Sequence, residues 1–500
     1  MVYAGFFFAT PINLATADLG RHIVNGELIV NGLTDVLYSN HYSFTETKRN
    51  FVNHHWGSGV LFYYIHSLAG FKGLSVLYIL LNLCAIAFMG LASSARNKLS
   101  IVLLAIISAV PLLAYRVEVR PEGFSYALLA LYYLLFSKYR AGKMSFKWLL
   151  IALLPLQVVW VNLHIFFFLG ILTSGAFLLE SLTIGDKSQF KKLLGLMVGL
   201  IAVSLINPHV HVGLLAPLTI FNEYGYMVAE NQTILFMHER FSNPQLYHFE
   251  FFGILALALI AYTIIKGIWK QNLPEILLSL SFLILGAIAV RGIPLFALFF
   301  IPLLASVANH FVQGLNYKTK DFVQSVLPYT AIVFLALFIP LKGTYLSAQK
   351  GFEGLGLNER INNCGNFIRD NELPGKMFNN YDFGSYLIYH LHATKKVFVD
   401  NRPEAYSVTF FDSIYKPMQE DEKVWKEKSE EYGINLIVFY RLDNTPWAQP
   451  FLIERAKDPE WVPIYVDEVS LILIRNRESN KRWIEQFALP RDMFTGVPNN

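Results

Sequence analysis

Long stretches without charge are the feature of this sequence that most restricts its fold. About eleven segments are apolar over most of their length: 2–16, 73–92, 99–115, 123–137, 147–160, 163–181, 193–207, 249–265, 274–290, 293–310 and 325–342. A helix needs about 20 mostly apolar residues to cross about 30 Å of hydrocarbon, where every backbone amide must be satisfied within the segment. The sequence therefore predicts an α-helical polytopic membrane protein with about 11 transmembrane helices.

Charged residues gather at the end of the chain. About 42 of them lie after residue 349, so the last 150 residues are about 28% charged and the preceding part about 10%. Soluble domains carry about 25% charged residues. We therefore expect a transmembrane domain over residues 1–345 and a soluble domain over residues 350–500.

The net charge and the cysteines exclude several classes of protein. The formal net charge is only +4, without the Lys- and Arg-rich runs that follow a phosphate backbone, so no nucleic acid is expected as a partner. Cys84 lies in an apolar run and Cys364 in the polar tail. Neither a disulfide framework nor a CxxC metal site is therefore expected.

Lys and Arg in alternate loops predict the orientation in the membrane. The loops after predicted spans two, four, six, eight and ten contain Arg96/Lys98, Lys138/Arg140/Lys143/Lys147, Lys187/Lys191/Lys192, Lys266/Lys270 and Lys318/Lys320. These loops should be cytoplasmic, whereas the longer, more acidic loops over about 17–71 and 208–248 should face outward. With an odd number of crossings, the C-terminal domain then lies on the outer side of the membrane as well. We expect a multi-pass protein of the plasma (inner) membrane with a periplasmic or extracellular C-terminal domain.

The 17–71 loop contains two predicted surface helices. Residues 19–29 have apolar side chains at helical spacing, with Asp18 and His22 four residues apart on one face. Residues 58–68 form a second amphipathic segment with aromatic side chains. Two such helices in one loop favour an active-site lid over a simple connection.

Several short strings, taken in order, resemble one family of membrane enzymes. They are Asp18-Leu19-Gly20-Arg21-His22 with Gly26-Glu27, Arg120-Pro121-Glu122, Trp160-Val161-Asn162-Leu163-His164, Asn207-Pro208-His209, Arg291-Gly292-Ile293-Pro294, Asn380-Tyr381-Asp382-Phe383-Gly384-Ser385-Tyr386-Leu387 and Val399-Asp400-Asn401-Arg402. With an acidic residue just after the first span, they resemble the GT-C superfamily of membrane glycosyltransferases. The similar branch is bacterial and related to the protein mannosyltransferases and the aminoarabinose transferases. The resemblance covers nearly the whole chain.

The resemblance implies an activity at the outer membrane face. It implies inverting transfer of a hexose or pentose from a polyprenyl-phosphate-linked donor to a lipid, glycan or protein acceptor, among membrane lipids. It also places the general base on a carboxylate of the 17–71 loop, here Asp18. One carboxylate suffices because a phosphate leaving group needs little or no protonation, and such a base contributes about 10²–10⁴-fold. No second acid adjoins Asp18, so Glu27 and Glu122 stay open as substitutes, and Asp18 also fits a helix N-cap.

The candidate substrate-binding residues can meet phosphate or sugar hydroxyl groups. They are Arg21, His22, Glu27, His54, His55, Arg116, Arg120, Glu122, Asn162, His164, His209 and Arg291. A planar guanidinium binds phosphate oxygens bidentately, which favours Arg116, Arg120 and Arg291. The alternative is that these arginines reach lipid head groups or pair with adjacent acids. We expect Asp18, Arg120 and Arg291 to converge on one outer cavity.

The histidines do not predict a metal held by the protein. None of them belongs to an HExxH pattern, and adjacent histidines such as His54 and His55 cannot easily aim at one ion. Mg²⁺ or Mn²⁺ bridging a carboxylate and the donor phosphate stays an open alternative, because hard cations prefer oxygen ligands.

The tail after about residue 350 predicts a small α/β domain. Helices are expected over 358–372, 383–392 and 420–432, and strands over 376–379, 396–400, 434–440, 461–466 and 470–475. Their alternation favours a partly parallel sheet, and no Gly-rich nucleotide loop accompanies it. Asp400 and Arg402 end a predicted strand. We favour a structural role, in which Arg402 pairs with Asp400 or Glu404, over a binding role.

Two other classes of protein fit the same composition. A transporter or flippase for a polar lipid or solute would carry acids and bases at mid-depth in its spans, whereas here they cluster at the predicted outer ends. A non-catalytic membrane scaffold whose tail binds a partner is the third interpretation.

Overall fold

The computed structural model describes residues 1–220, 224–316, 319, 326, 329–330, 333, 354–358 and 362–494. The chain forms two compact units. The helical unit consists of Met1–Pro11, Leu74–Pro217 and Val228–Leu355, and the α/β unit of Ile12–Gly73, Leu218–Met227 and Gly356–Asn500. The 17–71 loop therefore belongs to the same unit as the C-terminal domain. The predicted span 325–342 lies almost wholly outside the described residues.

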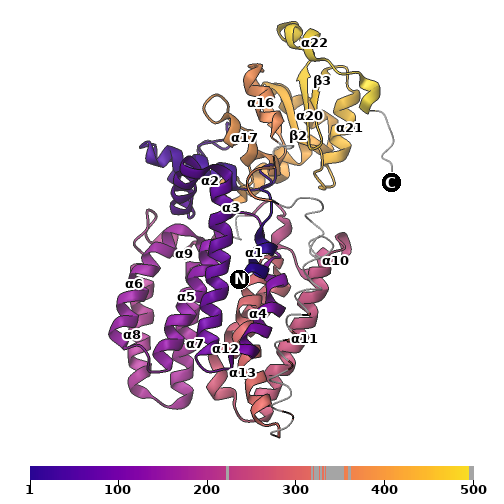
Figure 1. Ribbon diagram of the computed structural model, residues 1–500. Helices are drawn as coiled ribbons and strands as arrows, with labels where there is room; N and C mark the ends of the chain where they lie inside the picture. The colour runs from indigo at the N-terminus through magenta and orange to yellow at the C-terminus, as the bar shows by residue number, and fades with distance from the viewer. Residues whose placement is uncertain are drawn as a thin grey trace. The chain divides into compact units, whose positions relative to one another are not determined.

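Apolar helices make up the helical unit (Figure 1). They are α1 (Val2–Phe8), the second part of α3 (Trp56–Ser94), α4 (Leu99–Leu113), α5 (Glu122–Arg140), α6 (Phe146–Leu163), α7 (Phe168–Ile184), α8 (Lys187–Val203), α9 (His211–Thr219), α10 (Ile234–Arg240), α11 (Pro244–Ile265), α12 (Leu273–Ile288) and α13 (Ile293–Gln313). Short 3-10 helices join them: η2 (Ile165–Phe167), η4 (Ala229–Asn231), η5 (Trp269–Asn272) and η6 (Val290–Gly292).

Six helical segments among the described residues are long and apolar enough to cross a membrane. They are Trp56–Ser94, Phe146–Leu163, Ile165–Ile184, Pro244–Ile265, Trp269–Ile288 and Val290–Gln313, with Leu99–Leu113 as a shorter apolar helix. The predicted count of about eleven is therefore not confirmed. The predicted division of 147–181 is confirmed, because His164 adopts extended backbone (φ −159°, ψ 144°) between α6 and η2.

The first predicted span, 2–16, is wrong in length. Helix α1 ends at Phe8. Pro11 has no backbone N–H to continue a helix, and Asn13 Oδ1 accepts a hydrogen bond from Ala15 N (3.0 Å). Ile12 N donates to Gly356 O (2.7 Å), so the chain has left the helix well before residue 16.

One end of the helical unit is assembled from three connections. Helix α13 packs against both α4 and α12, and α5 packs against α6 and α7. The α4–α5 connection, η4 and η6 lie at the end where α5 begins. Val290 N donates to Gln232 O (3.1 Å), which ties η6 to the segment that follows η4.

Helix α3 contains the break that the sequence predicts between a surface helix and a span. Its 39 residues are interrupted at Gly70, whose backbone (φ 59°, ψ −159°) suits glycine. The amphipathic residues 58–68 therefore precede this break, and the apolar residues 73–92 follow it.

The α/β unit is built on a four-stranded mixed sheet. Its strands β1 (Lys376–Asn379), β2 (Ile434–Tyr440), β3 (Trp461–Val466) and β4 (Ser470–Arg475) have the order β1-β2-β4-β3. The β1–β2 pair is parallel and the other two pairs are antiparallel. The predicted partly parallel sheet is confirmed.

Helices and short turns surround this sheet. They are α2 (Leu19–Val30), η1 (Thr34–Leu37), α16 (Asn363–Asp370), η9 (Tyr381–Phe383), α17 (Gly384–Leu391), η10 (Pro403–Ala405), α18 (Val408–Phe410), the π-helical turn η11 (Phe411–Tyr415), α19 (Pro417–Glu420), α20 (Glu422–Glu431), α21 (Ala448–Lys457), η12 (Glu478–Asn480), α22 (Lys481–Phe487) and η13 (Arg491–Phe494). The predicted helices 19–29, 383–392 and 420–432 correspond to α2, α17 and α20. The described part of 358–372 contains α16.

The predicted strand 396–400 is wrong. Val397 pairs with Ser43 of the 17–71 loop through a parallel bridge, and Val397 N donates to Tyr42 O (3.0 Å). The segment is apolar because its side chains enter the aromatic core, to which Phe51 and Tyr226 also contribute from the two long loops. Burial against these loops produces the same sequence pattern as burial in a sheet.

Two glycines permit close contacts of α17, one with α2 and one with the backbone at Asp400. A Cβ at Gly20 would lie 2.8 Å from Tyr389 Cβ and 2.9 Å from Ser385 O, and a Cβ at Gly384 would collide with the backbone of Asp400. Arg21 N donates to Ser385 Oγ (3.0 Å). Two of the strings that suggested a family, 365 residues apart in sequence, therefore pack directly on each other.

Candidate functional site

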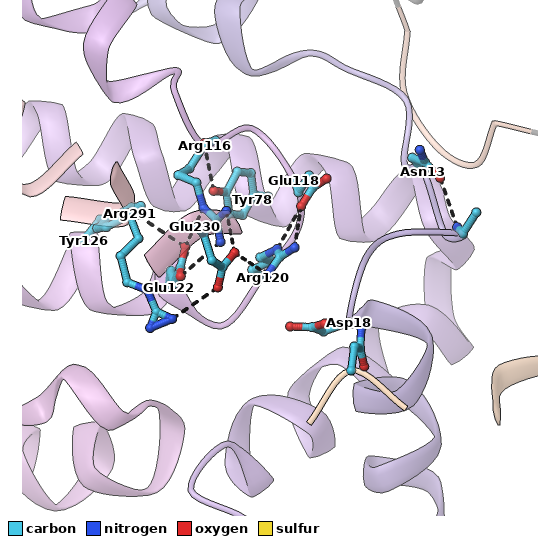
Figure 2. A network of polar contacts seen from close by, with 12 residues as sticks. Asn13, Asp18, Tyr78, Arg116, Glu118, Arg120, Glu122, Tyr126, Glu230 and Arg291 are labelled. Carbon is cyan, nitrogen blue, oxygen red and sulfur yellow. Dashed lines mark hydrogen bonds and ion pairs between the residues drawn. The ribbon is translucent and has the colours of Figure 1, made fainter. Parts of the chain in front are cut away.

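Three arginines and a glutamate meet at one end of the helical unit (Figure 2). Arg116 and Arg120 lie on the α4–α5 connection, Arg291 on η6, and Glu230 on η4. The proline-initiated helix α13 begins directly after η6. Three connections that are separate in sequence thus supply one cluster, which we call the arginine cluster.

Glu230 is the centre of the arginine cluster. Its Oε2 lies 2.7 Å from Arg116 Nη1 and 3.1 Å from Arg120 Nη1, and its Oε1 lies 3.2 Å from Arg291 Nη2. The exposed fraction is 12–14% for the three arginine side chains and 17% for Glu230. One carboxylate therefore accepts hydrogen bonds from three guanidiniums that are largely shielded from water.

Adjacent acids complete the cluster. Glu122 accepts from Arg116 Nε and Nη2 at 3.2 Å each, and Glu118 accepts from Arg120 Nε at 2.8 Å. Tyr78 OH donates to Arg116 O (3.1 Å) and so fixes the backbone of the connection. The predicted alternative, in which Arg116 and Arg120 pair with neighbouring acids, is confirmed alongside the pairing with Glu230.

Electrostatics fix the charge state of this cluster. Burial opposes ionisation of Glu230, but the guanidiniums of Arg116, Arg120 and Arg291 outweigh it and hold the pKa of Glu230 well below its usual range. Burial also opposes the charge on Arg116, while Glu122 and Glu230 raise the pKa of Arg116 above its usual value. Glu230 and Arg116 consequently stay charged through the physiological range.

Three of the candidate substrate-binding residues in the helical unit make contacts with residues outside the arginine cluster. His164 Nδ1 is 2.8 Å from Ser125 Oγ, which lies one helical turn after Glu122 on α5. Asn162 Nδ2 donates to Val158 O and Ile206 O at 2.8 Å each, and so joins α6 to the end of α8. His209 N donates to Asn207 Oδ1 (2.8 Å) in the turn after α8. These contacts are those of residues that hold helix ends and turns in place.

Asp18 lies at the start of α2 in the α/β unit. Among the described residues its carboxylate makes no side-chain capping bond to α2, so the predicted role as an N-cap is wrong for the side chain. Asp18 Oδ1 instead accepts a hydrogen bond from Asn401 Nδ2 of the C-terminal domain.

The other candidate residues of the 17–71 loop gather around α2. The His22 ring is edge-on to His55 with 5.4 Å between centroids, and the His55 ring lies 4.1 Å from that of His54. His54 Nδ1 is 3.0 Å from Val52 O. Glu27 lies farther along α2, 3.8 Å from His392 Nε2. The three histidines form one group, and Glu27 belongs to a separate contact.

Arg21 is a buried guanidinium without a close carboxylate among the described residues. The residue is only 4% exposed, and its Nε has no hydrogen-bond partner there. Its charge acts at longer range on Asp400 and Glu404. A buried cation of this kind is suited to an anionic or hydroxyl-rich ligand.

Asp400 and Arg402 form the structural pair that the sequence favours. Arg402 Nε donates to Asp400 Oδ1 (2.6 Å) and Arg402 Nη2 to Asp400 Oδ2 (2.7 Å). Both residues are fully buried, and burial opposes the charge on Asp400, but Arg402 outweighs it and lowers the pKa of Asp400. The pair anchors the backbone on both sides of Asn401.

Two residues of these sites were missed from the sequence. Glu230 was seen only as one of several acids in the 208–248 loop, and Asn401 only as part of a string. Each of them belongs to a site because of a hydrogen bond to a residue more than 60 positions away in the sequence. No local pattern could have identified these partners.

The described residues contain no group of three or more His, Cys, Asp or Glu side chains that could hold a metal ion. Asp18 is engaged by an amide donor rather than by a second acid. Dependence on Mg²⁺ or Mn²⁺ stays a prediction.

Comparisons with known proteins identify the fold. No protein-family model and no curated protein sequence matches the chain. The archaeal oligosaccharyltransferase AglB from Archaeoglobus fulgidus, solved with an inhibitory peptide and a dolichol-phosphate, matches with a TM-score of 0.59 and 12% identity over 96% of this chain and 74% of AglB. ArnT from Cupriavidus metallidurans in the apo state matches with a TM-score of 0.56 and 12% identity over 94% of this chain and 96% of ArnT. The chain has the GT-C fold.

The likeness in fold extends over nearly the whole chain. ArnT bound to undecaprenyl phosphate also matches, with a TM-score of 0.54 and 11% identity over 94% of this chain and 96% of ArnT. At such identities the comparison establishes the fold and does not extend to individual residues. The resemblance predicted from the sequence is confirmed at that level.

Proposed function

We propose that this GT-C protein is an inverting membrane glycosyltransferase. It transfers a sugar from a polyprenyl-phosphate-linked donor to a lipid, glycan or protein acceptor. The observation that carries the proposal is the convergence of Arg116, Arg120 and Arg291 on one carboxylate, because the same three guanidiniums can bind a phosphate. Dolichol-phosphate in AglB and undecaprenyl phosphate in ArnT support a lipid-phosphate ligand.

The arginine cluster stabilises the leaving group. As the bond between the anomeric carbon and the phosphate oxygen breaks, its electron pair passes to the phosphate. Preorganised guanidiniums in a water-poor site are effective at stabilising such developing charge. Glu230 occupies the place of the phosphate in the free protein, and the donor displaces it.

Asp18 is the general base. Its carboxylate takes the proton of the acceptor hydroxyl as that oxygen attacks the anomeric carbon from the face opposite the phosphate. The new bond therefore has inverted configuration. Arg21, His22, His54 and His55 bind the sugar or the acceptor near the base.

The membrane arrangement is part of the proposal. About eleven crossings, with the 17–71 loop and the C-terminal domain outside the plasma (inner) membrane, agree with the alternating Lys- and Arg-rich loops of the sequence. The six apolar helices among the described residues support a multi-pass protein.

A donor panel tests the function. Purified protein is given radiolabelled polyprenyl-phosphate sugars, and transfer by the wild type is compared with transfer by Asp18→Asn and Asp35→Asn. Asp35 is a matched control because it is an exposed acid of the same loop, bonded to Ser39 Oγ (2.6 Å). Asp18→Asn should lower kcat by about 10²–10⁴-fold, while Asp35→Asn keeps wild-type kcat.

Two outcomes would contradict the proposal. Equal turnover by the wild type and Asp18→Asn removes Asp18 as the base. Movement of a labelled lipid across vesicles without any sugar transfer identifies a flippase instead.

A further inference from the structure

Asn401 connects the C-terminal domain to Asp18. Its side-chain amide donates to Asp18 Oδ1 although 383 residues separate the two in sequence. Both belong to the α/β unit. A hydrogen bond from an uncharged amide to a carboxylate favours the ionised form and fixes the plane of the carboxylate.

The backbone that carries Asn401 is held on both sides. Besides the two bonds from Arg402, Asp400 Oδ2 accepts from Tyr406 OH (2.9 Å). Arg402 Nη2 also donates to Asn40 Oδ1 (2.7 Å), and the guanidinium lies 4.6 Å from the centre of the Phe51 ring. This buried network ties the 400–402 turn to the 17–71 loop.

The backbone that carries Asp18 is held equally closely. Helix α2 begins at the next residue, and Gly20 brings that helix into contact with Ser385 and Tyr389 of α17. Gly384, at the start of α17, lies directly against the backbone of Asp400. One compact framework thus fixes the Cα positions of both Asp18 and Asn401.

This framework is more elaborate than helix capping requires. An Asp at this position ordinarily accepts a hydrogen bond from the first turn of its own helix, and the Asp18 side chain makes no such bond among the described residues. The Asp18 carboxylate therefore accepts a hydrogen bond from Asn401, in a distant part of the chain, where an Asp at a helix start commonly accepts one from a nearby backbone N–H.

We infer that Asn401 is a positioning residue that orients the Asp18 carboxylate toward the acceptor hydroxyl. This inference rests on the proposed function and extends it, because it gives the C-terminal domain a part in the transfer step. Asn401 itself forms no bond to the reacting atoms, and the proton still passes from the acceptor hydroxyl to Asp18.

Kinetics of three variants separate positioning from simple packing. Asn401→Asp keeps the shape of the side chain but replaces the donor by a second carboxylate, and Asn401→Ala removes the whole side-chain amide. We expect kcat to fall about 10- to 100-fold in Asn401→Ala and further in Asn401→Asp, with the donor KM unchanged, since small misplacements cost about 10²-fold. Asn371→Ala, which loses only a bond to Phe367 O (2.9 Å), is the control and keeps wild-type kcat.

A double exchange tests the contact without reference to turnover. Asp18→Asn combined with Asn401→Asp restores an amide–carboxylate pair with its members interchanged. Each single variant should lower the midpoint of unfolding, and the double variant should restore it. Sugar transfer should stay absent in the double variant, because position 18 lacks a base.

The outcomes distinguish this inference from the proposed function. Wild-type kcat in Asn401→Asp, or additive changes in the unfolding midpoint, overturns the positioning role while leaving Asp18 as the base. Wild-type turnover in Asp18→Asn overturns the base and the positioning role together. A loss of kcat in both Asn401 variants with recovery of the midpoint in the double exchange supports the inference.

Discussion

At the scale of single residues, Glu230 shows how one carboxylate holds three arginines together. Three guanidiniums packed together would repel one another, and the central carboxylate compensates them. The pKa of Glu230 is lowered, so its ion pairs contribute stability above the unfolded pKa of about 4.3, and that contribution is lost as the pH falls through the folded value. In the proposed function, Glu230 therefore competes with the donor phosphate at every physiological pH.

This competition gives a prediction for Glu230→Gln. The amide keeps the shape of the side chain but removes its charge, so undecaprenyl phosphate should bind about tenfold more tightly, equivalent to about 1.4 kcal/mol. Because Glu230 is ionised throughout, the gain should be the same from about pH 5 to 8. Calorimetric titration of the detergent-solubilised protein measures it.

Glu118→Gln is the matched control for that titration. Glu118 pairs with Arg120 alone among these arginines and is twice as exposed as Glu230, at 34% against 17%. Removal of the Glu118 charge should therefore change the affinity for undecaprenyl phosphate less than removal of the Glu230 charge does. Weaker binding by Glu230→Gln would show that the carboxylate holds the arginines in place rather than competing with the ligand.

At the scale of elements, the contact between α2 and α17 orders the loop that bears Asp18. Gly20 permits this contact because its Cα lies against Ser385 O and Tyr389 Cβ. Gly20→Ala should lower the free energy of unfolding by about 1–3 kcal/mol. It should also lower kcat, because Asp18 directly precedes α2. Chemical denaturation and the transfer assay measure the two effects.

Gly195→Ala provides the comparison for this helix substitution. Apart from the backbone of α8 itself, no described atom lies within 4 Å of the position that its Cβ would take. Alanine is the better helix former by about 1 kcal/mol, so stability should stay equal or rise. Equal behaviour of Gly20→Ala and Gly195→Ala would contradict a close helix contact at Gly20.

At the scale of the whole molecule, the α/β unit is assembled from three separate segments. The aromatic core of the C-terminal domain includes Phe51 from the 17–71 loop and Tyr226 from the 208–248 loop, with the Tyr226 and Tyr381 rings stacked at 4.0 Å. The two loops therefore depend on the C-terminal domain for their burial.

Truncation after Leu355 tests this dependence. Removing β1–β4 and α17 exposes the apolar side chains of residues 12–73, so proteolysis within that segment should become much faster. Mass spectrometry of the fragments locates the cleavage sites. The α5–α6 connection belongs to the helical unit, so it should be cleaved at the same rate in the truncated and the full-length protein. Unchanged protection of residues 12–73 in the truncated protein would show that this segment folds alone.

The sequence by itself determined many of the elements of this protein. Hydropathy and spacing predicted α2, the break after residues 58–68, the end of α6 at His164 and strands β1 to β4, because each depends on contacts a few residues apart or on burial alone. The arginines could also be recognised as candidates, since a charge between two apolar segments needs a reason.

Only the tertiary structure decided how these elements combine. It paired Val397 with Ser43 instead of with the sheet, placed Glu230 among three arginines, and joined Asn401 to Asp18. An apolar strand has the same pattern whether it is buried by a sheet or by a loop, and a polar side chain does not encode its partner. These contacts link residues tens to hundreds of positions apart, so they are fixed by packing of the whole chain rather than by local preference.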